Sequence, residues 1–373
     1  MYQQVKLGDK FKLYRGSSPR PIINYISNNN SDPYWIKIGD MPDNGYIVNS
    51  IKEHISIEGA KKSRRVYKGD MILSNSMSFG KPYILNVDGF IHDGWFVIRN
   101  YERSFDRDYL RYLLASPTVQ KRYSQIAAGG VVLNISSDLV NSVIVKIPSL
   151  DEQKKISSFL SVLDERIQVQ NKIIEDLNKL KKSLIDDKFT NTEFSISLKE
   201  VLIERKSYSE KGLEYEHVTL SKDGIIPKGE RYDRDFLVTN ESKEYKITKL
   251  NDICYNPANL KFGVICLNDY KDSIFSPIYV TFEVSKKYDP YYVSIYLTSD
   301  KFIKKILKYQ QGTVYERMSV NPDDFLKGRL PIIKDQESFI NLIKTIERKC
   351  IVEKELLKNY EIQKEYLLKN MFI

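Results

Sequence analysis

Apolar residues recur in steps of four and three along two long stretches of the chain, residues 146–189 and 329–372. This is the spacing of a coiled-coil seam. The two stretches align without a gap at one constant offset, which places Phe189 on Phe372. The pattern predicts one long helix that the chain uses twice. The predicted seam residues are Ile156, Leu160, Leu163, Ile167, Ile174, Leu177 and Leu184 in the first copy and Phe339, Ile343, Ile346, Cys350, Leu357, Tyr360 and Leu367 in the second.

Polar residues interrupt each seam at matching places. Gln170 in the first copy corresponds to Glu353 in the second, and Lys181 corresponds to Lys364. A polar layer at Gln170 and Glu353 would fix the register of the two helices at some cost in stability. Two surface-exposed interruptions are the alternative.

The segments between the helices have the mixed pattern of an α+β fold. In the first segment, residues 32–41 and 94–100 predict strands, and residues 64–85 predict two strands joined by a polar loop. A helix is predicted from Arg107 to about Ala127. The second segment repeats this plan, and the offset that relates the two helices holds again from Gly80 and Gly263 onward.

The predicted architecture is therefore a globular domain followed by a long helix, twice over. The domains are expected at residues 1–148 and 190–331, and the helices at residues 149–189 and 332–373. Each domain is expected to hold a mixed β-sheet with helices. Because both copies lie in one chain, a pseudo-twofold arrangement with the two helices packed antiparallel is the economical solution.

Charge is distributed unevenly along the 373 residues, whose net charge is +9. Residues 1–150 hold 20 Lys and Arg against 13 Asp and Glu, whereas residues 190–333 hold 22 against 21. The first domain therefore carries the stronger indication of a polyanionic partner. No apolar run is long enough for a membrane span, so we expect a cytoplasmic protein without membrane contact. The three cysteines and three histidines are scattered, which predicts neither a disulfide framework nor a zinc site.

Two segments have a weak likeness to catalytic motifs. Glu204-Arg-Lys206 fits the end of a nuclease metal site, but no well-placed upstream aspartate supports it. Residues 255–259 have a faint likeness to a methyltransferase motif, and the aligned position suggests a turn at the end of a strand. The sequence contains no phosphate-binding loop and no hydrolase motif. These observations predict a protein that is not an enzyme and that binds no cofactor or metal itself.

Loops rich in basic, amide, hydroxyl and aromatic side chains fall at matching points of both domains. Such side chains neutralise phosphates and present donors to base edges in the major groove. The candidate DNA-contacting residues are Arg15, Ser17, Arg20, Asn75, Ser76, Phe79, Lys81 and Asn134 in the first domain and Lys206, Tyr208, Asn259, Lys261, Gln310, Gln311, Thr313 and Arg317 in the second.

With its two domain-plus-helix copies, the whole chain resembles the specificity (S) subunit of type I restriction–modification systems. The likeness also rests on three segments: WIKIGDM at residues 35–41, AAGGVVLNIS at residues 127–136, and IPxxDEQxxI followed by LD within residues 147–164. The second copy departs from this pattern, since Lys334-Asp335 replaces Asp151-Glu152. That departure and the nearly neutral second domain leave open whether both domains bind DNA equally strongly.

This resemblance implies that two target-recognition domains each read one half of a split sequence in double-stranded DNA. It also implies that the two helices set the length of the unread spacer and dock two methyltransferase subunits. Those subunits would bring S-adenosylmethionine and methylate a flipped-out adenine. Restriction subunits that use ATP and Mg²⁺ to translocate DNA can join the complex. A coiled-coil adaptor whose domains bind proteins is the alternative, and a nuclease that uses Glu204 and Lys206 is a third hypothesis.

Overall fold

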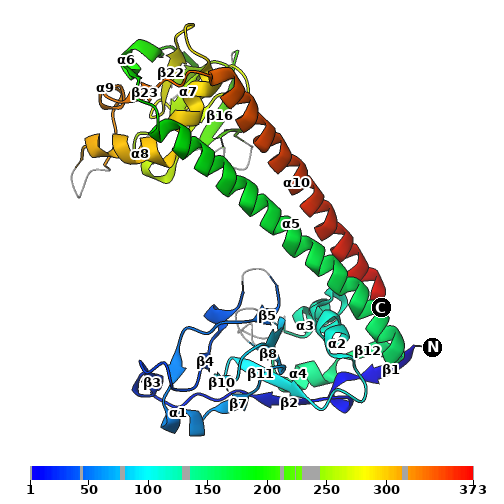
Figure 1. Ribbon diagram of the computed structural model, residues 1–373. Coiled ribbons are helices and arrows are strands. Elements are labelled where there is room, and N and C mark those ends of the chain that lie inside the picture. The colour runs from blue at the N-terminus through cyan, green and yellow to red at the C-terminus, as the bar shows by residue number, and fades with distance from the viewer. Residues whose placement is uncertain are drawn as a thin grey trace. The chain divides into compact units, whose positions relative to one another are not determined.

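The computed structural model describes residues 2–42, 45–75, 80–127, 135–210, 214–222, 224–228, 244–312 and 318–372. They form two compact units (Figure 1). The first unit joins residues 1–172 to residues 354–373, and the second consists of residues 173–353. The two long helices are α5 (Leu150–Thr190) and α10 (Gln336–Met371). Each unit therefore contains one globular domain together with parts of both long helices.

The first domain is built on a five-stranded mixed sheet in the order β2-β11-β8-β9-β5, with β5 parallel to β9. A three-stranded sheet in the order β4-β10-β7 and two short ribbons, β1-β12 and β3-β6, complete it. The strands are β1 (Gln3–Lys6), β2 (Lys12–Arg15), β3 (Ile26–Ser27), β4 (Trp35–Ile36), β5 (Ile47–Val48), β6 (His54–Ile55), β7 (Arg64–Val66), β8 (Met71–Ser74), β9 (Pro82–Leu85), β10 (Gly89–Ile91), β11 (Trp95–Arg99) and β12 (Ile144–Ile147). The helices are α1 (Ile57–Lys61), α2 (Arg107–Ala115), α3 (Pro117–Ala127) and α4 (Ser137–Ser142).

The main core of the first domain lies between α2 and the five-stranded sheet. Strands β8, β9 and nearly all of β11 are buried on both faces, which explains their continuous apolar sequences. Leu73 and Ile98 face the main core together with Leu110 and Leu114 of α2. On the opposite face of the sheet, Val97 belongs to a smaller cluster.

Two sequence-based predictions for the first domain were wrong in detail. The helix predicted from Arg107 to Ala127 is two helices, because Pro117 forces Ser116 into an extended conformation that ends α2. The strand predicted over residues 32–41 is reduced to β4. After β4 the chain turns, and the backbone N–H of Lys37 donates to the Asp40 carboxylate at 2.8 Å.

The second domain contains a four-stranded sheet, β14-β22-β19-β20, a five-stranded sheet, β15-β18-β21-β16-β17, and the ribbon β13-β23. Its strands are β13 (Ser195–Ser197), β14 (Leu202–Glu204), β15 (Tyr208–Glu210), β16 (Glu216–Ser221), β17 (Gly224–Pro227), β18 (Glu244–Thr248), β19 (Ile253–Tyr255), β20 (Ile265–Leu267), β21 (Ser273–Phe275), β22 (Val280–Val284) and β23 (Arg329–Pro331). Its helices are α6 (Leu198–Val201), α7 (Pro290–Leu297), α8 (Asp300–Ile306) and α9 (Pro322–Phe325), with the 3-10 turns η6 (Leu260–Phe262) and η7 (Leu307–Tyr309).

Helices α2 and α7 are equivalent elements of the two domains. Asp106 caps α2 by accepting from the backbone N–H of Tyr109 at 3.0 Å, and Asp289 caps α7 by accepting from that of Tyr292 at 2.8 Å. These capping residues keep the offset that relates the two long helices. The pairing of the central strands keeps it too, because Ile72 pairs with Val97 and their counterparts Tyr255 and Val280 also pair.

The two long helices run antiparallel in each unit. In the first unit, Lys364 of α10 lies 2.6 Å from Asp164 of α5. In the second unit, Lys181 of α5 lies 3.3 Å from Glu347 of α10. The offset between the two copies places Lys181 on Lys364 and Asp164 on Glu347. The two units therefore repeat the same ion pair between the two long helices. The polar interruptions at Lys181 and Lys364 thus form ion pairs across the helix pair.

The predicted seam residues are all buried or half-buried, with Leu160 and Ile343 fully buried. Gln170 and Glu353 are 5% and 7% exposed. The alternative that these two residues are surface-exposed interruptions is therefore wrong. Cys350 on the same seam is a buried free thiol. None of the helices in the described ranges has the length and apolar content that a membrane crossing requires.

Asp164 also joins the helix pair to the first domain. Its carboxylate accepts from the Tyr112 hydroxyl at 2.7 Å and from the Arg111 guanidinium at 3.3 Å, both in α2. In the second unit, Glu347 accepts from the hydroxyl of Tyr291 in α7. One acidic residue per unit thus binds a tyrosine of the domain and a lysine of the facing helix.

Candidate nucleic-acid interface

Several of the predicted DNA-contacting residues of the first domain converge on Asp93. This residue lies in the turn between β10 and β11, where its carboxylate accepts from the Ser18 hydroxyl at 2.9 Å and from the Arg20 guanidinium at 3.0 Å. Its backbone carbonyl accepts from Arg15 Nε at 3.2 Å and from Asn75 Nδ2 at 2.8 Å. Arg15 ends β2 and Asn75 follows β8, so three separate elements bring their side chains to one turn.

The electrostatics of this turn favour a charged Asp93. Partial burial alone would raise the pKa of Asp93, but hydrogen bonds from Ser18 and the backbone, with the charges of His92 and Arg20, hold that pKa below its usual value. Burial is the main cause that lowers the pKa of His92, which favours a neutral ring. Consistently, His92 Nδ1 accepts from the backbone N–H of Gly94 at 2.8 Å.

The Asp93 turn presents donors to solvent. The Arg20 side chain is 81% exposed and uses one donor on Asp93, so the rest of its fork can bind a phosphate or a guanine edge. Beside the turn, a hollow of about 440 Å³ is lined in part by Arg15, Asn75 and Ser136. This region thus holds basic and amide donors around one fixed carboxylate, an arrangement suited to hydrogen bonding with a ligand.

The other candidates of the first domain lie away from this turn or outside the described residues. Ser17 donates through its hydroxyl to the carbonyl of Lys62 at 3.1 Å. Lys81 is exposed, and its ammonium lies 5.2 Å from the ring centroid of Tyr83. The candidates outside the described residues are Ser76, Phe79 and Asn134.

In the second domain, Gln310 and Gln311 hold together the two ends of a loop. Gln310 Nε2 donates to the carbonyl of Met318 at 3.0 Å, and Gln311 Nε2 donates to the Asp324 carboxylate at 2.8 Å. The backbones of Gln311 and Ser319 also form a bridge. The candidates Thr313 and Arg317 lie outside the described residues.

The remaining candidates of the second domain lie on two other segments. Asn259 and Lys261 belong to the turn at η6, and the Lys261 ammonium lies 4.9 Å from the ring centroid of Phe262. The Asn256 side chain forms this turn by accepting from the backbone N–H of Ala258 at 3.1 Å, which confirms a turn at the end of a strand. Lys206 lies between β14 and β15, and Tyr208 is the first residue of β15.

Glu204, one of the two residues in the nuclease hypothesis, forms ion pairs with two lysines. Its carboxylate lies 3.3 Å from the Lys246 ammonium and 3.4 Å from that of Lys206. Among the described residues, no group of three or more His, Cys, Asp or Glu side chains is placed to hold a metal ion.

Comparisons with known proteins agree on one family. Residues 1–179 match the family model for the type I restriction modification DNA specificity domain. The MjaIX specificity subunit, from a type I restriction enzyme of Methanocaldococcus jannaschii, is 27% identical over 193 residues, which are 50% of this chain and less than half, 44%, of that protein. The putative MjaX specificity subunit of the same organism is 23% identical over 304 residues, 73% of this chain and 68% of that protein. Residues 1–179 therefore carry a domain of this specificity family.

Two solved structures share the fold of this chain. The type I restriction–modification S subunit from M. genitalium has a TM-score of 0.58 at 16% identity, covering 100% of this chain and 96% of that one. A chain from a structure on assembly and conformational transition of the type I R-M system has a TM-score of 0.61 at 14% identity, covering 98% and 96%. Both matches extend over both domains and both helices.

Sequence reasoning missed the residues that organise the Asp93 turn of the first domain. Asp93 and Ser18 were not among the candidates, although they fix the side chains that were. A single aspartate in a turn gives no periodic signal, and Arg15, its most distant partner, lies 78 residues away in the sequence. The sequence also contains a local cluster of four lysines within residues 301–308. The net charge of the second domain is nearly neutral, so a count over the whole domain does not reveal this cluster.

Proposed function

We propose that this chain is the DNA sequence-specificity subunit of a type I restriction–modification complex and has no catalytic site of its own. Residues 1–148 and 190–331 act as two target-recognition domains, one for each half of a bipartite target in double-stranded DNA. Residues 149–189 and 332–373 act as the spacer helices. The complex works in the cytoplasm.

The observation that carries this proposal is that two equivalent domains are fastened to one helix pair by equivalent contacts. The ring of Phe372 lies 5.2 Å from that of Tyr109, and the ring of Phe189 lies 5.8 Å from that of Tyr292. Each domain is thus fixed to helices that are longer than its own core requires. A protein that reads two separated half-sites needs this arrangement, because the separation of its binding elements sets the separation of the half-sites.

The adaptor alternative explains the helices but not the chemistry of the first domain. Arg15, Arg20 and Asn75 surround one turn with donors suited to phosphates and base edges. The match of residues 1–179 to a DNA specificity domain favours DNA over a protein ligand. The helix pair then serves a second purpose and docks two methyltransferase subunits, which supply S-adenosylmethionine. Restriction subunits would bring ATP and Mg²⁺.

Binding measurements on the chain in complex with its methyltransferase partner test this function. We expect target DNA to bind more tightly than a scrambled duplex, and both affinities to fall steeply as salt rises. Equal affinity for target and scrambled duplexes at every salt concentration would overturn the proposal.

A further inference from the structure

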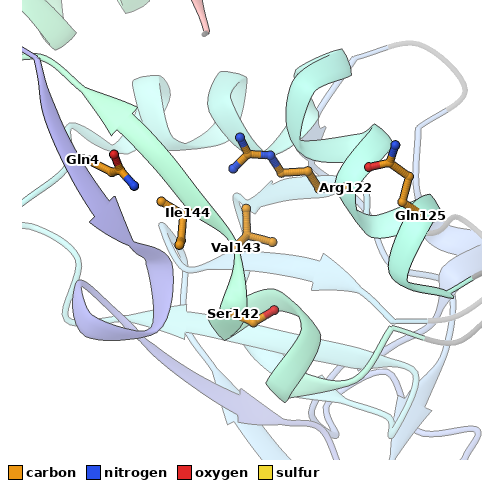
Figure 2. Close-up of a pocket in the computed structure, with 6 residues that line it drawn as sticks. All are labelled: Gln4, Arg122, Gln125, Ser142, Val143 and Ile144. Carbon is orange, nitrogen blue, oxygen red and sulfur yellow. The ribbon is translucent and has the colours of Figure 1, made fainter.

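The same hollow occurs in both domains, between the third helix of the domain and its last strand. In the first domain it lies between α3 and β12, where Arg122, Gln125 and Ile144 line about 400 Å³ (Figure 2). In the second it lies between α8 and β23 and measures about 430 Å³. The offset between the two copies places Lys305 on Arg122, Lys308 on Gln125 and Lys327 on Ile144. The hollow is therefore a feature of the repeated fold.

The two hollows differ in charge. Among the described residues that line the first hollow, Arg122 is the one cation. Four cations line the second hollow, which are Lys305, Lys308, Lys327 and Arg329. The second domain is nearly neutral as a whole, with 22 Lys and Arg against 21 Asp and Glu in residues 190–333. Four of these 22 cations thus line one hollow.

Two of these four cations are already engaged. The Lys327 ammonium lies 2.6 Å from the Asp324 carboxylate, and Arg329 Nε donates to the Ser195 hydroxyl at 3.0 Å. Lys305 and Lys308 are both exposed. No carboxylate in the described part of the chain lies within ion-pair distance of these two ammonium groups. They are therefore open to an anion from outside the chain.

The second hollow adjoins the predicted DNA-contacting loop of its domain. Helix α8 continues through η7, which contains Lys308, directly to Gln310 and Gln311. Gln311 donates to Asp324, the carboxylate that also binds Lys327. One hydrogen-bonded chain therefore links the base of the loop to the wall of the hollow.

We propose that the hollow between α8 and β23 binds the phosphate backbone of DNA through Lys305 and Lys308. This proposal rests on the proposed DNA-recognition function. Exposed lysines neutralise phosphates without reading the base sequence. The contiguity with the loop favours nucleic acid over an acidic protein, because a backbone bound here would continue to the loop that reads bases.

The test uses the full chain assembled with its methyltransferase partner. The double variant Lys305→Gln/Lys308→Gln removes two charges from the hollow, and Lys301→Gln/Lys304→Gln removes two from the same helix outside it. Affinity is measured for a target and a scrambled duplex over a range of salt concentrations. Each lost phosphate contact makes the slope of log affinity against log salt shallower by about 0.9. We expect a change of up to about 1.8 for the hollow variant, the same for both duplexes, and wild-type slopes for the control and for Lys305→Arg/Lys308→Arg.

An unchanged slope in the hollow variant would overturn the proposal, and so would an equal change in the control. Weaker assembly with the methyltransferase at an unchanged slope would assign the hollow to a protein partner instead. Failure of the proposed function itself would look different. In that case the wild-type complex would bind target and scrambled duplexes equally, whatever the hollow variant did to the slope.

Discussion

The ring of Phe372, at the C-terminal end of α10, lies 5.2 Å from the ring of Tyr109 in the core of the first domain. The backbone carbonyl of Phe372 also accepts from the Thr118 hydroxyl at 2.6 Å. Phe372 thus packs onto the helices of the first domain. In the second unit, Phe189 at the end of α5 plays the same part and is 4% exposed. Each copy of the long helix therefore carries a buried phenylalanine near its C-terminal end that packs against a domain.

Phe372→Ala is expected to destabilise the first unit, even though the residue lies far along the sequence from that domain's helices. Deleting a fully buried phenylalanine costs about 3 to 5 kcal/mol. Hydrogen exchange should show faster exchange in α2 and unchanged exchange in α7. Tyr366→Ala, which truncates a side chain that is 66% exposed on the same helix, serves as the control. Equal effects of the two variants would contradict the anchoring role.

Asp164→Ala should destabilise the first unit more than a change at a neighbouring surface acid. The side chains of Asp164 and Arg111 are 8% and 5% exposed, so removing the carboxylate leaves a buried guanidinium without its counter-charge. Breaking such a pair costs about 3 to 5 kcal/mol. Glu165→Ala removes an exposed carboxylate of the same helix and should have little effect. Urea unfolding of both variants measures the difference, and similar midpoints would show that the buried pair is not stabilising.

Asp93→Asn should lower sequence discrimination more than overall affinity for DNA. The substitution removes the charge that holds Arg20 and weakens the acceptor for Ser18, so the donors at this turn lose their fixed geometry. A well-placed bidentate contact contributes about 1 to 3 kcal/mol of discrimination between bases. Competition between target and scrambled duplexes measures the ratio. Asp88→Asn, an exposed charge change in the same domain, is the matched control, and an equal loss in both would remove Asp93 from recognition.

The stability of the first domain should fall as the pH drops from about 7.5 towards 5.5, in part because of His92. Burial is the largest cause and lowers the pKa of this ring, against the opposing charge of Asp93. The unfolded chain therefore binds a proton near the usual pKa of about 6.5, whereas the folded chain binds it only at lower pH. The stabilising contribution of neutral His92 is present above about pH 6.5 and is lost below it.

Unfolding free energies of the wild type and of His92→Asn between about pH 5 and 8 measure this linkage. The variant should show a shallower dependence on pH over that range. A steeper slope in His92→Asn would reverse the sign of the argument. Asp93, whose pKa is lowered, contributes stability above its ordinary pKa of 3.8 and loses it only as the pH falls further, outside this range.

The repeated helix could be predicted because a seam is a periodic pattern that one sequence displays in full. Ile343 and Leu160 belong to that pattern, and so does the polar interruption at Lys181. Its ion pair with Glu347 was not predicted. The general plan of each domain could also be predicted, since strands such as β8 and β9 are continuous apolar runs between turns.

The arrangement of the strands and of the candidate site could not be predicted in this way. The parallel pairing of Trp35 with Phe90 joins residues that share no local pattern. Asp93 acquires its role only when folding brings Arg15 and Asn75 to it. The hollow at α8 depends equally on the fold, because Lys327 and Arg329 reach Lys305 from a later segment that ends in β23.

Mapping methylated adenines in cells that carry this chain and its methyltransferase partner tests the central claim most directly. The account predicts one bipartite motif, with two specified blocks separated by a fixed stretch of unspecified bases. Exchange of residues 1–148 for the corresponding domain of a relative should then change one block and leave the other block and the spacing unaltered. A motif without a gap, or an exchange that alters both blocks, would contradict the assignment of one half-site to each domain.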